Sequence, residues 1–151
     1  MQITRQADYA LRTVLYLAGL EDGGRAPTGK IAREQRVPPS FLAKIVSQLA
    51  IAGLVQTARG ARGGVSLARP AGEISLLEVI QAVDGPIRLF ECLDDPAGCV
   101  FGEACPMRET LCNVQERLIR ELSTADFRQL AARQRELARQ VLSLAPSSSK
   151  S

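Results

Sequence analysis

Four cysteines in one short segment are the residues of this sequence best suited to chemistry. They are Cys92, Cys99, Cys105 and Cys112, with the spacing C-x6-C-x5-C-x6-C. No Cys-x-x-Cys pair is present, so the spacings typical of a zinc ribbon or a thioredoxin-type redox site are missing. Glycine and proline interrupt the intervening loops, which could wrap thiolates around a group larger than one ion. Because soft thiolates select iron–sulfur clusters, a cluster is the favoured ligand. A mononuclear zinc site, a thiol–disulfide switch and inert cysteines are the alternatives.

The composition argues against an enzyme and against a membrane protein. The 151 residues include no histidine, so neither a Ser/His/Asp nor a Cys/His catalytic arrangement can form. The glycine-rich stretch "RGARGGV" lies in a predicted hairpin, which is the wrong context for a phosphate-binding loop. No apolar run approaches the ~20 residues that span a bilayer. Charges inside the first hydrophobic stretch do not suit a signal peptide. We therefore expect a cytoplasmic protein with reduced thiols and no enzymatic activity.

Charge is distributed unevenly along the chain. Residues 1–80 contain ten Lys/Arg against six Asp/Glu, whereas residues 81–112 contain two Arg against six acids. A basic first half followed by an acidic cysteine segment indicates two separate tasks. The acidic surroundings also disfavour free thiolates, which a bound metal would stabilise.

Helical spacing of apolar residues predicts most of the elements that must position these cysteines. A first helix is predicted with Thr4 as its N-cap, a second with Thr28 as its cap, and a third over 40–53 that ends at Gly53. Two β-type runs, 54–58 and 65–68, flank a tip rich in Gly and Arg and predict a hairpin.

Three further helices are predicted after the hairpin. The first covers 75–83 and leads into the cysteine loop. The second covers 113–122, because Asn113 and Glu116 have capping-box spacing. The last covers 125–142, with Ser123 or Thr124 as its cap. The final residues, 146–151, are predicted to be a disordered tail.

The order of the first elements is that of a winged helix-turn-helix that reads DNA. The third helix buries one apolar face, so that Ser40, Lys44 and Ser47 face outward, where a recognition helix contacts the major groove. Arg59 and Arg62 lie at the tip of the hairpin, thin enough to enter a minor groove that attracts arginine. The alternative is that these are ordinary solvated charges on a small domain.

The stretch "IAREQRVPPSFLAKIVSQLAIAGLVQTARGARGGVSLARP", with the opening "MQITRQADYALR", resembles the Rrf-type (BadM-like) bacterial transcription regulators. The resemblance runs from Met1 to about Leu130. It implies a mostly α fold with a small β-wing, in which a winged helix-turn-helix domain is followed by a C-terminal dimerisation helix. The implied divisions are 1–83 for DNA binding, 84–112 for the cysteine loop, 113–145 for the dimerisation and C-terminal helices, and 146–151 for the tail.

The resemblance also implies a homodimer on a pseudo-palindromic operator in double-stranded DNA. The expected dimer helix carries an apolar stripe of Leu111, Val114, Leu118 and Leu122. Packing of this stripe within one chain is the alternative.

Within this family, the iron–sulfur branch (IscR, NsrR and RirA types) implies that Cys92, Cys99 and Cys105 are cluster ligands. The IscR type uses a histidine after the third cysteine, and Met107 stands there instead, which excludes that ligand set. In the NsrR type the fourth ligand is an aspartate from the partner chain, at a position that matches Asp8. The RirA type leaves the fourth ligand less defined. The alternative for Asp8 is a surface ion pair with Arg12 at i,i+4.

Cys112 departs from the family pattern. If the following helix is capped by Asn113, Cys112 lies in the loop and could be the fourth ligand. If the helix begins near Pro106, Cys112 lies two turns beyond Cys105, about 10.5 Å along the axis, which is far for one cluster. An exchange ligand for a damaged cluster and a buried small apolar residue are its other roles.

The combined hypothesis is a DNA-binding transcription regulator that contains an iron–sulfur cluster and senses nitric oxide, redox state or iron. Asp8 and the absent histidine favour a 4Fe–4S over a 2Fe–2S cluster. One alternative is the same regulator with a zinc or thiol–disulfide switch. An alternative of another class is a small metal or redox carrier.

Overall fold

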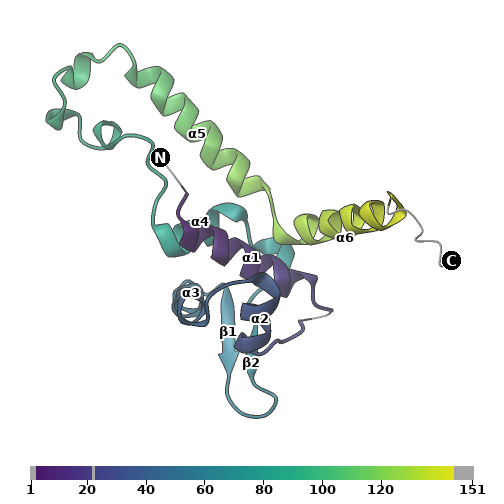
Figure 1. The fold of residues 1–151 in the computed structure, drawn as a ribbon. Coiled ribbons are helices and arrows are strands. Elements are labelled where there is room, and N and C mark those ends of the chain that lie inside the picture. Colours follow the sequence, from purple (N-terminus) through teal and green to yellow (C-terminus); the bar gives the residue numbers. More distant parts are fainter. Residues whose placement is uncertain (1–2, 22, 145–151) are drawn as a thin grey trace.

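The computed structural model describes residues 3–21 and 23–144 (Figure 1). The predicted disordered tail lies outside these residues. The described chain is mostly helical with one small two-stranded sheet, as predicted. Within it, no helix is both long enough and apolar enough to cross a membrane.

The first part of the chain forms a compact body, residues 3–87. Its elements are the helices α1 (Arg5–Gly19), α2 (Thr28–Gln35), α3 (Pro39–Ile51) and α4 (Leu76–Asp84) and the strands β1 (Val55–Ala58) and β2 (Gly64–Leu67). The strands pair antiparallel, with Val55 opposite Leu67, and form the predicted hairpin. This hairpin extends from the body below α2 and α3 as a wing (Figure 1).

Local capping explains where the helices of the body begin and end. Thr4 caps α1 as predicted, because its Oγ1 accepts a hydrogen bond from the Ala7 N–H at 3.3 Å. Thr28 does not cap α2; it is the first helical residue, and Pro27 before it has the extended cap conformation. Gly53 follows α3 with a φ of 73°, which confirms it as the helix-ending residue.

The predicted inner face of α3 is confirmed. Leu42, Ile45, Val46 and Leu49 are all buried in the main core. Val14 of α1, Ile31 of α2 and Val65 of β2 pack in the same cluster. Phe127, from beyond the cysteine segment, is 1% exposed there and attaches the last helix to the body.

Residues 88–124 form an arm that leaves the body after α4 (Figure 1). Three short 3-10 helices, Glu91–Leu93, Pro96–Gly98 and Gly102–Ala104, carry the cysteine segment to the far end of α5 (Arg108–Thr124). At its base, α5 packs Leu118, Ile119 and Leu122 against a second small core of Ala7, Ile80 and Ile87. The last helix, α6 (Phe127–Leu144), then leaves in another direction.

The predicted starts of the last two helices are wrong. Asn113 does not cap α5, because the helix already begins at Arg108 and Asn113 is an exposed residue within it. The cap of α6 is Asp126, whose Oδ1 accepts from the Gln129 N–H at 2.9 Å. Ser123 and Thr124 instead lie in the last turn of α5, where their hydroxyls donate to backbone carbonyls of that helix.

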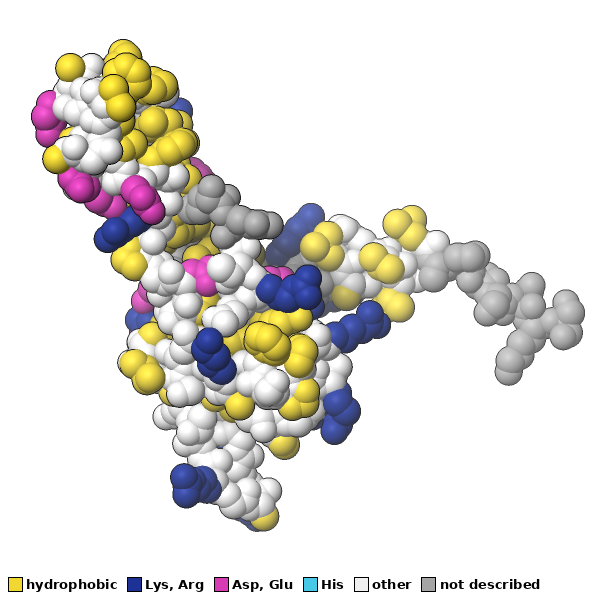
Figure 2. Space-filling model, turned by 60° about the vertical axis from the view of Figure 1, so that its left-hand side comes forward, with side chains coloured by type: hydrophobic (Ala, Val, Ile, Leu, Met, Phe, Trp, Pro, Cys, Tyr) yellow, Lys and Arg dark blue, Asp and Glu magenta, His cyan; other side chains and the backbone are white. Residues whose placement is uncertain are grey.

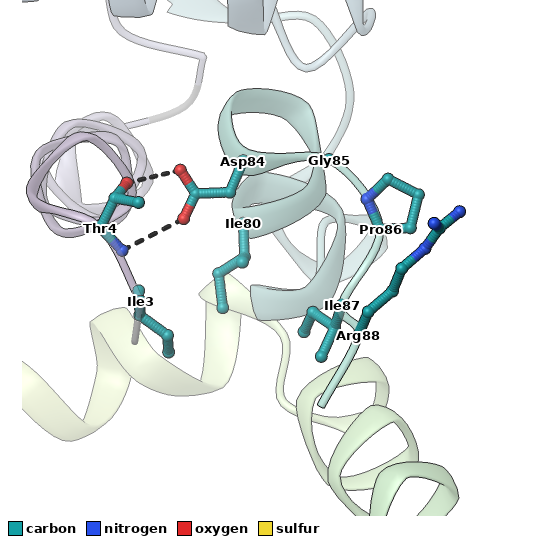
Figure 3. Close-up of a pocket in the computed structure, with 8 residues that line it drawn as sticks. All are labelled: Ile3, Thr4, Ile80, Asp84, Gly85, Pro86, Ile87 and Arg88. Carbon is teal, nitrogen blue, oxygen red and sulfur yellow. Dashed lines mark hydrogen bonds between the residues drawn. The ribbon is translucent and has the colours of Figure 1, made fainter. Parts of the chain in front are cut away.

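A cavity of about 200 Å³ marks the junction of body and arm (Figure 3). Its apolar wall includes Ile3, Ile80 and Ile87. On its polar side, the Asp84 carboxylate accepts from the Thr4 hydroxyl at 2.5 Å and from the Thr4 N–H at 3.2 Å. The start of α1 is thereby held against the end of α4, where the arm begins.

We predict that Gly64→Ala destabilises the wing. Gly64 has a φ of 140°, and a Cβ added there would lie 2.4 Å from the Ala26 carbonyl oxygen. Backbone strain of this kind costs about 1–3 kcal/mol before the clash is added. Gly29→Ala is the control, because its Cβ would meet open space in α2 and should be neutral or stabilise by about 0.4–1 kcal/mol. Urea unfolding of both variants measures the difference, and equal midpoints would contradict the prediction.

We also predict that the Glu78 carboxylate makes the free energy of unfolding depend on pH. Burial alone would raise the pKa of the Glu78 carboxyl, but hydrogen bonds from Arg69 (2.7 Å) and Ser75 (2.9 Å) outweigh it and lower this pKa. The stabilisation is therefore present above the carboxyl's ordinary pKa and lost as pH falls through the lowered one. Glu78→Gln should lower the urea midpoint at neutral pH and flatten its decline toward about pH 3.

Glu116→Gln is the matched control for this carboxylate. Glu116 is exposed on α5 and has no salt bridge among the described residues. Its variant should follow the pH profile of the wild type. A Glu78→Gln profile parallel to that of the wild type would show that the capping box contributes no pH-dependent stability.

Candidate sulfur site and nucleic-acid interface

Three of the four cysteines lie around one small cavity at the far end of the arm. Cys92, Cys99 and Cys105 line it, together with Leu93, Gly102, Arg108 and Leu111. The cavity measures about 10 Å³, which is the volume that one water molecule requires. All three thiols are half-buried and form no disulfide. The structure therefore brings together the three cysteines that the family resemblance grouped.

The short 3-10 helices of the arm produce this convergence. Cys92 lies within the first of them, and Cys99 and Cys105 directly follow the second and third. Asp95 caps the second helix by accepting from the Ala97 N–H at 3.2 Å. Gly102 adopts a φ of 50° and donates its N–H to the Cys99 carbonyl at 3.0 Å. Repeated tight turns thus return the chain to the same cavity at each cysteine.

The three donors at this site are soft thiols, a ligand type that zinc ions and iron–sulfur clusters share. A zinc ion requires its ligands to converge at about 2.0–2.3 Å from one point. Among the residues that the structure describes, no three His, Cys, Asp or Glu side chains are grouped so as to hold one metal ion. In a cluster the thiolates bind different iron atoms, so their sulfurs stand further apart. The three thiols supply soft donors around one cavity, and a cluster there would require the turns that carry them to open beyond the volume of about 10 Å³.

Arg108 is the residue of this site that sequence reasoning missed. Its guanidinium donates to the carbonyl oxygens of Cys92 and Leu93, both at 3.1 Å. It is the only charged side chain among the residues that line the thiol cavity. The sequence carried one signal of it, a basic residue three positions after Cys105 in an otherwise acidic segment.

Asp8 and Cys112, the two candidates for the fourth ligand, lie outside this cavity. Asp8 is on α1 and pairs with Arg12 through two contacts, at 2.5 and 3.1 Å, which is the arrangement of the alternative interpretation. Cys112 lies within α5 and not in the loop, because that helix begins at Arg108. It is half-buried, on the α5 face that also carries Arg108 and Gln115.

The residues predicted to meet DNA are all on the surface of the body. Ser40, Lys44 and Ser47 are exposed along α3, and Arg59 and Arg62 are exposed at the tip of the wing. Within the described chain, Lys44, Arg59 and Arg62 form no salt bridge. Figure 2 shows acidic side chains gathered on the arm, whereas Lys and Arg side chains extend over the body to the wing tip. Phe41, 47% exposed on α3, packs the edge of its ring against Tyr9 of α1, with the ring centroids 6.3 Å apart.

The helix order, the paired wing and the exposed basic side chains define a winged helix-turn-helix protein of the DNA-binding type. A model of the Rrf2 family, described as an iron-dependent transcriptional regulator, matches residues 3–133. The chain belongs to this family, and it is a transcription regulator and not an enzyme. Members of the family bind DNA, typically as dimers.

Solved structures of this family share the fold. CymR of B. subtilis, a global cysteine regulator, is 28% identical with a TM-score of 0.73, covering 87% of this chain and 97% of its own. The oxidized form of Staphylococcus aureus CymR is 26% identical with a TM-score of 0.68, covering 87% and 96%. IscR of T. potens is 18% identical with a TM-score of 0.66, covering 100% and 93%, and its likeness concerns the fold alone.

Proposed function

We propose that this protein is a transcription regulator whose DNA binding is controlled by an iron–sulfur cluster held by Cys92, Cys99 and Cys105. The observation that carries the proposal is the meeting of these three thiols around one cavity, at the end of an arm away from the DNA-binding body. The description of the family as iron-dependent supports it. The alternative of a small metal carrier is abandoned, because the chain belongs to a family of regulators.

The fourth ligand that we propose is Asp8, supplied by the second subunit of a homodimer. Within one chain Asp8 lies on the body and does not line the thiol cavity, so another copy must bring it there. Ligation would replace its contacts with Arg12. Cys112 is the alternative, and it would require the first turns of α5 to unwind, since it lies within that helix. The choice of Asp8 and the absence of histidine favour a 4Fe–4S over a 2Fe–2S cluster.

The signal reaches DNA through the geometry of the arm. When bound, a cluster supplies a group that nitric oxide or oxidants can modify and that is lost when iron is limiting. Either event changes the group bound to the three cysteines. Residues 91–105 then rearrange against α5, whose base packs through Leu118, Ile119 and Leu122 on the body. The two recognition helices of a dimer must match half-sites about one DNA turn apart, so a modest shift of the bodies changes affinity. The result is a population shift between DNA-competent and incompetent dimers.

A second candidate is a thiol–disulfide switch on the same fold. The solved CymR structures, which are 26–28% identical, include one described as a cysteine regulator and one described as oxidized. The half-buried, free thiols of Cys92, Cys99 and Cys105 around one cavity are also compatible with disulfide exchange. Metal content separates the two candidates.

We expect anaerobically purified protein to contain about four iron and four acid-labile sulfide per chain, the composition of one 4Fe–4S cluster. About two of each would identify a 2Fe–2S cluster. Stoichiometric zinc, or no metal after reconstitution, would contradict the cluster and leave a zinc or thiol switch. Each of Cys92→Ser, Cys99→Ser and Cys105→Ser should lose the iron.

Asp8→Asn and Arg12→Gln distinguish a ligand from a surface ion pair. Both variants break the pair, but only the first removes the carboxylate. If Asp8 is a ligand, its variant loses iron in air several-fold faster than wild type, whereas the Arg12 variant retains it. Equal behaviour of the two would assign Asp8 to the ion pair alone, and Cys112→Ser then tests the remaining candidate.

Replacing the basic side chains of the body should weaken DNA binding and reduce its salt dependence. The probe is a DNA fragment selected by the wild-type protein from a random pool. Each lost phosphate contact lowers the slope of log affinity against log salt by about 0.9, so Arg59→Ala with Arg62→Ala should lower it by up to about 2. Lys44→Ala should weaken binding as well. Arg135→Ala, exposed on α6, is the control and should leave affinity unchanged. Unaltered slopes for all variants would contradict the DNA interface.

A further inference from the structure

We propose that Arg108 is a positioning residue of the sulfur site, which holds the Cys92 backbone on α5 and places a permanent positive charge beside the three thiols. Because this role rests on the proposed cluster function, its test includes a measurement on cluster-free protein. Two observations carry it: the paired hydrogen bonds of the guanidinium, and its place among the residues that line the thiol cavity.

The hydrogen bonds attach one end of the cysteine segment to the helix. Arg108 donates from Nη1 to the Cys92 carbonyl and from Nη2 to the Leu93 carbonyl. Two turns further along the same face, the Gln115 Oε1 accepts from the Leu89 N–H at 2.9 Å. The stretch from Leu89 to Leu93, which includes Cys92, is therefore held by two side chains of α5. Among the described residues, no side chain makes a comparable bond to the backbone of Cys99 or Cys105.

The positive charge of Arg108 would offset the repulsion between negative groups in this segment. Three thiolates that share one cavity repel one another, and the surrounding segment is acidic. Arg88, the other cation of the segment, already pairs with Asp94 at 3.0 Å and does not line the cavity. A guanidinium stays protonated at every physiological pH, so its charge is constant when the thiols change state. Arg108 is thus the fixed counter-charge of the site.

Because of its position in the chain, Arg108 connects the cysteine segment to the start of α5. It is the first residue of α5, and the C-terminal end of that helix is packed on the body. A displacement of the Cys92 backbone therefore acts on the first turn of α5 through a side chain whose two bonds fix its orientation. Lysine would keep the charge but could not reproduce the planar fork toward two carbonyls. Glutamine would lose the charge.

The experiment compares Arg108→Lys and Arg108→Gln with wild type and with Arg117→Gln. Arg117 is the matched control, because it is exposed on the same helix and makes no side-chain hydrogen bond or salt bridge among the described residues. In reduced, cluster-free protein, amide hydrogen exchange of residues 89–95 is measured. Both Arg108 variants should exchange about tenfold faster there, as expected for the loss of a hydrogen bond from a charged group, and Arg117→Gln should match wild type.

The reduction potential of the loaded site tests the charge separately. Removing a nearby positive charge disfavours the addition of an electron, so Arg108→Gln should shift the midpoint potential to a lower value. Arg108→Lys should stay close to wild type, and so should Arg117→Gln. A loop that is merely loosened would shift the Lys and Gln variants alike, which would overturn the counter-charge.

Failure of this inference is distinguishable from failure of the proposed function. If wild-type protein holds no iron and sulfide, the cluster function fails and the counter-charge fails with it, while hydrogen exchange alone decides whether Arg108 holds Cys92. If wild-type protein is loaded and Arg108→Gln matches it in both exchange and potential, the role of Arg108 is overturned and the cluster function stands.

Discussion

The close packing of α1 through small side chains is the constraint on which the rest of the molecule depends. Ala7 and Ala10 lie less than one helical turn apart on α1, and neither has any exposed surface. Ala10 belongs to the main core with α3 and the wing, whereas Ala7 belongs to the second core, where α4 meets the base of α5. A larger residue at either position would separate the helices that meet there. One helix thus links the DNA-facing body to the cysteine arm.

Beyond this junction, few residues of the arm and of the last helix are buried by the rest of the chain. No described residue of α5 is buried, and α6 buries only Phe127 and Ala131. Val114 is 49% exposed, so part of the apolar stripe predicted for α5 remains open, and Val141 of α6 is 69% exposed. A helix of this kind takes most of its stability from tertiary packing. The dimers typical of the family would supply that packing, while Leu118 and Leu122 already pack within the chain.

The elements that follow strict periodicity could be predicted from the sequence, and those decided by competing local contacts could not. The inner face of α3, the cap at Thr4, the hairpin and Gly53 are confirmed, because apolar spacing or a positive φ specifies each of them. The start of α5 is wrong, because a capping-box pattern at Asn113 does not stop a helix that can extend to Arg108. Arg108 was missed for a related reason: its partners are carbonyl groups, which leave no mark in the sequence. The convergence of three cysteines was expected from a family resemblance, and their ligation remains a prediction.

The acidic cysteine segment and the single cation in the lining of the thiol cavity fit one electrostatic requirement. A sulfur site that must change state should favour neither the fully occupied nor the empty condition by a wide margin, since a switch needs states a few kcal/mol apart. The segment around the cavity is acidic, whereas the one charged side chain in the cavity lining is the guanidinium of Arg108. Arg108 is also the first residue of α5, so the counter-charge that we propose is the group that connects the site to the helix. In the proposed switch, the electrostatic response of the thiol cavity and the mechanical response of the arm would therefore meet in this one side chain.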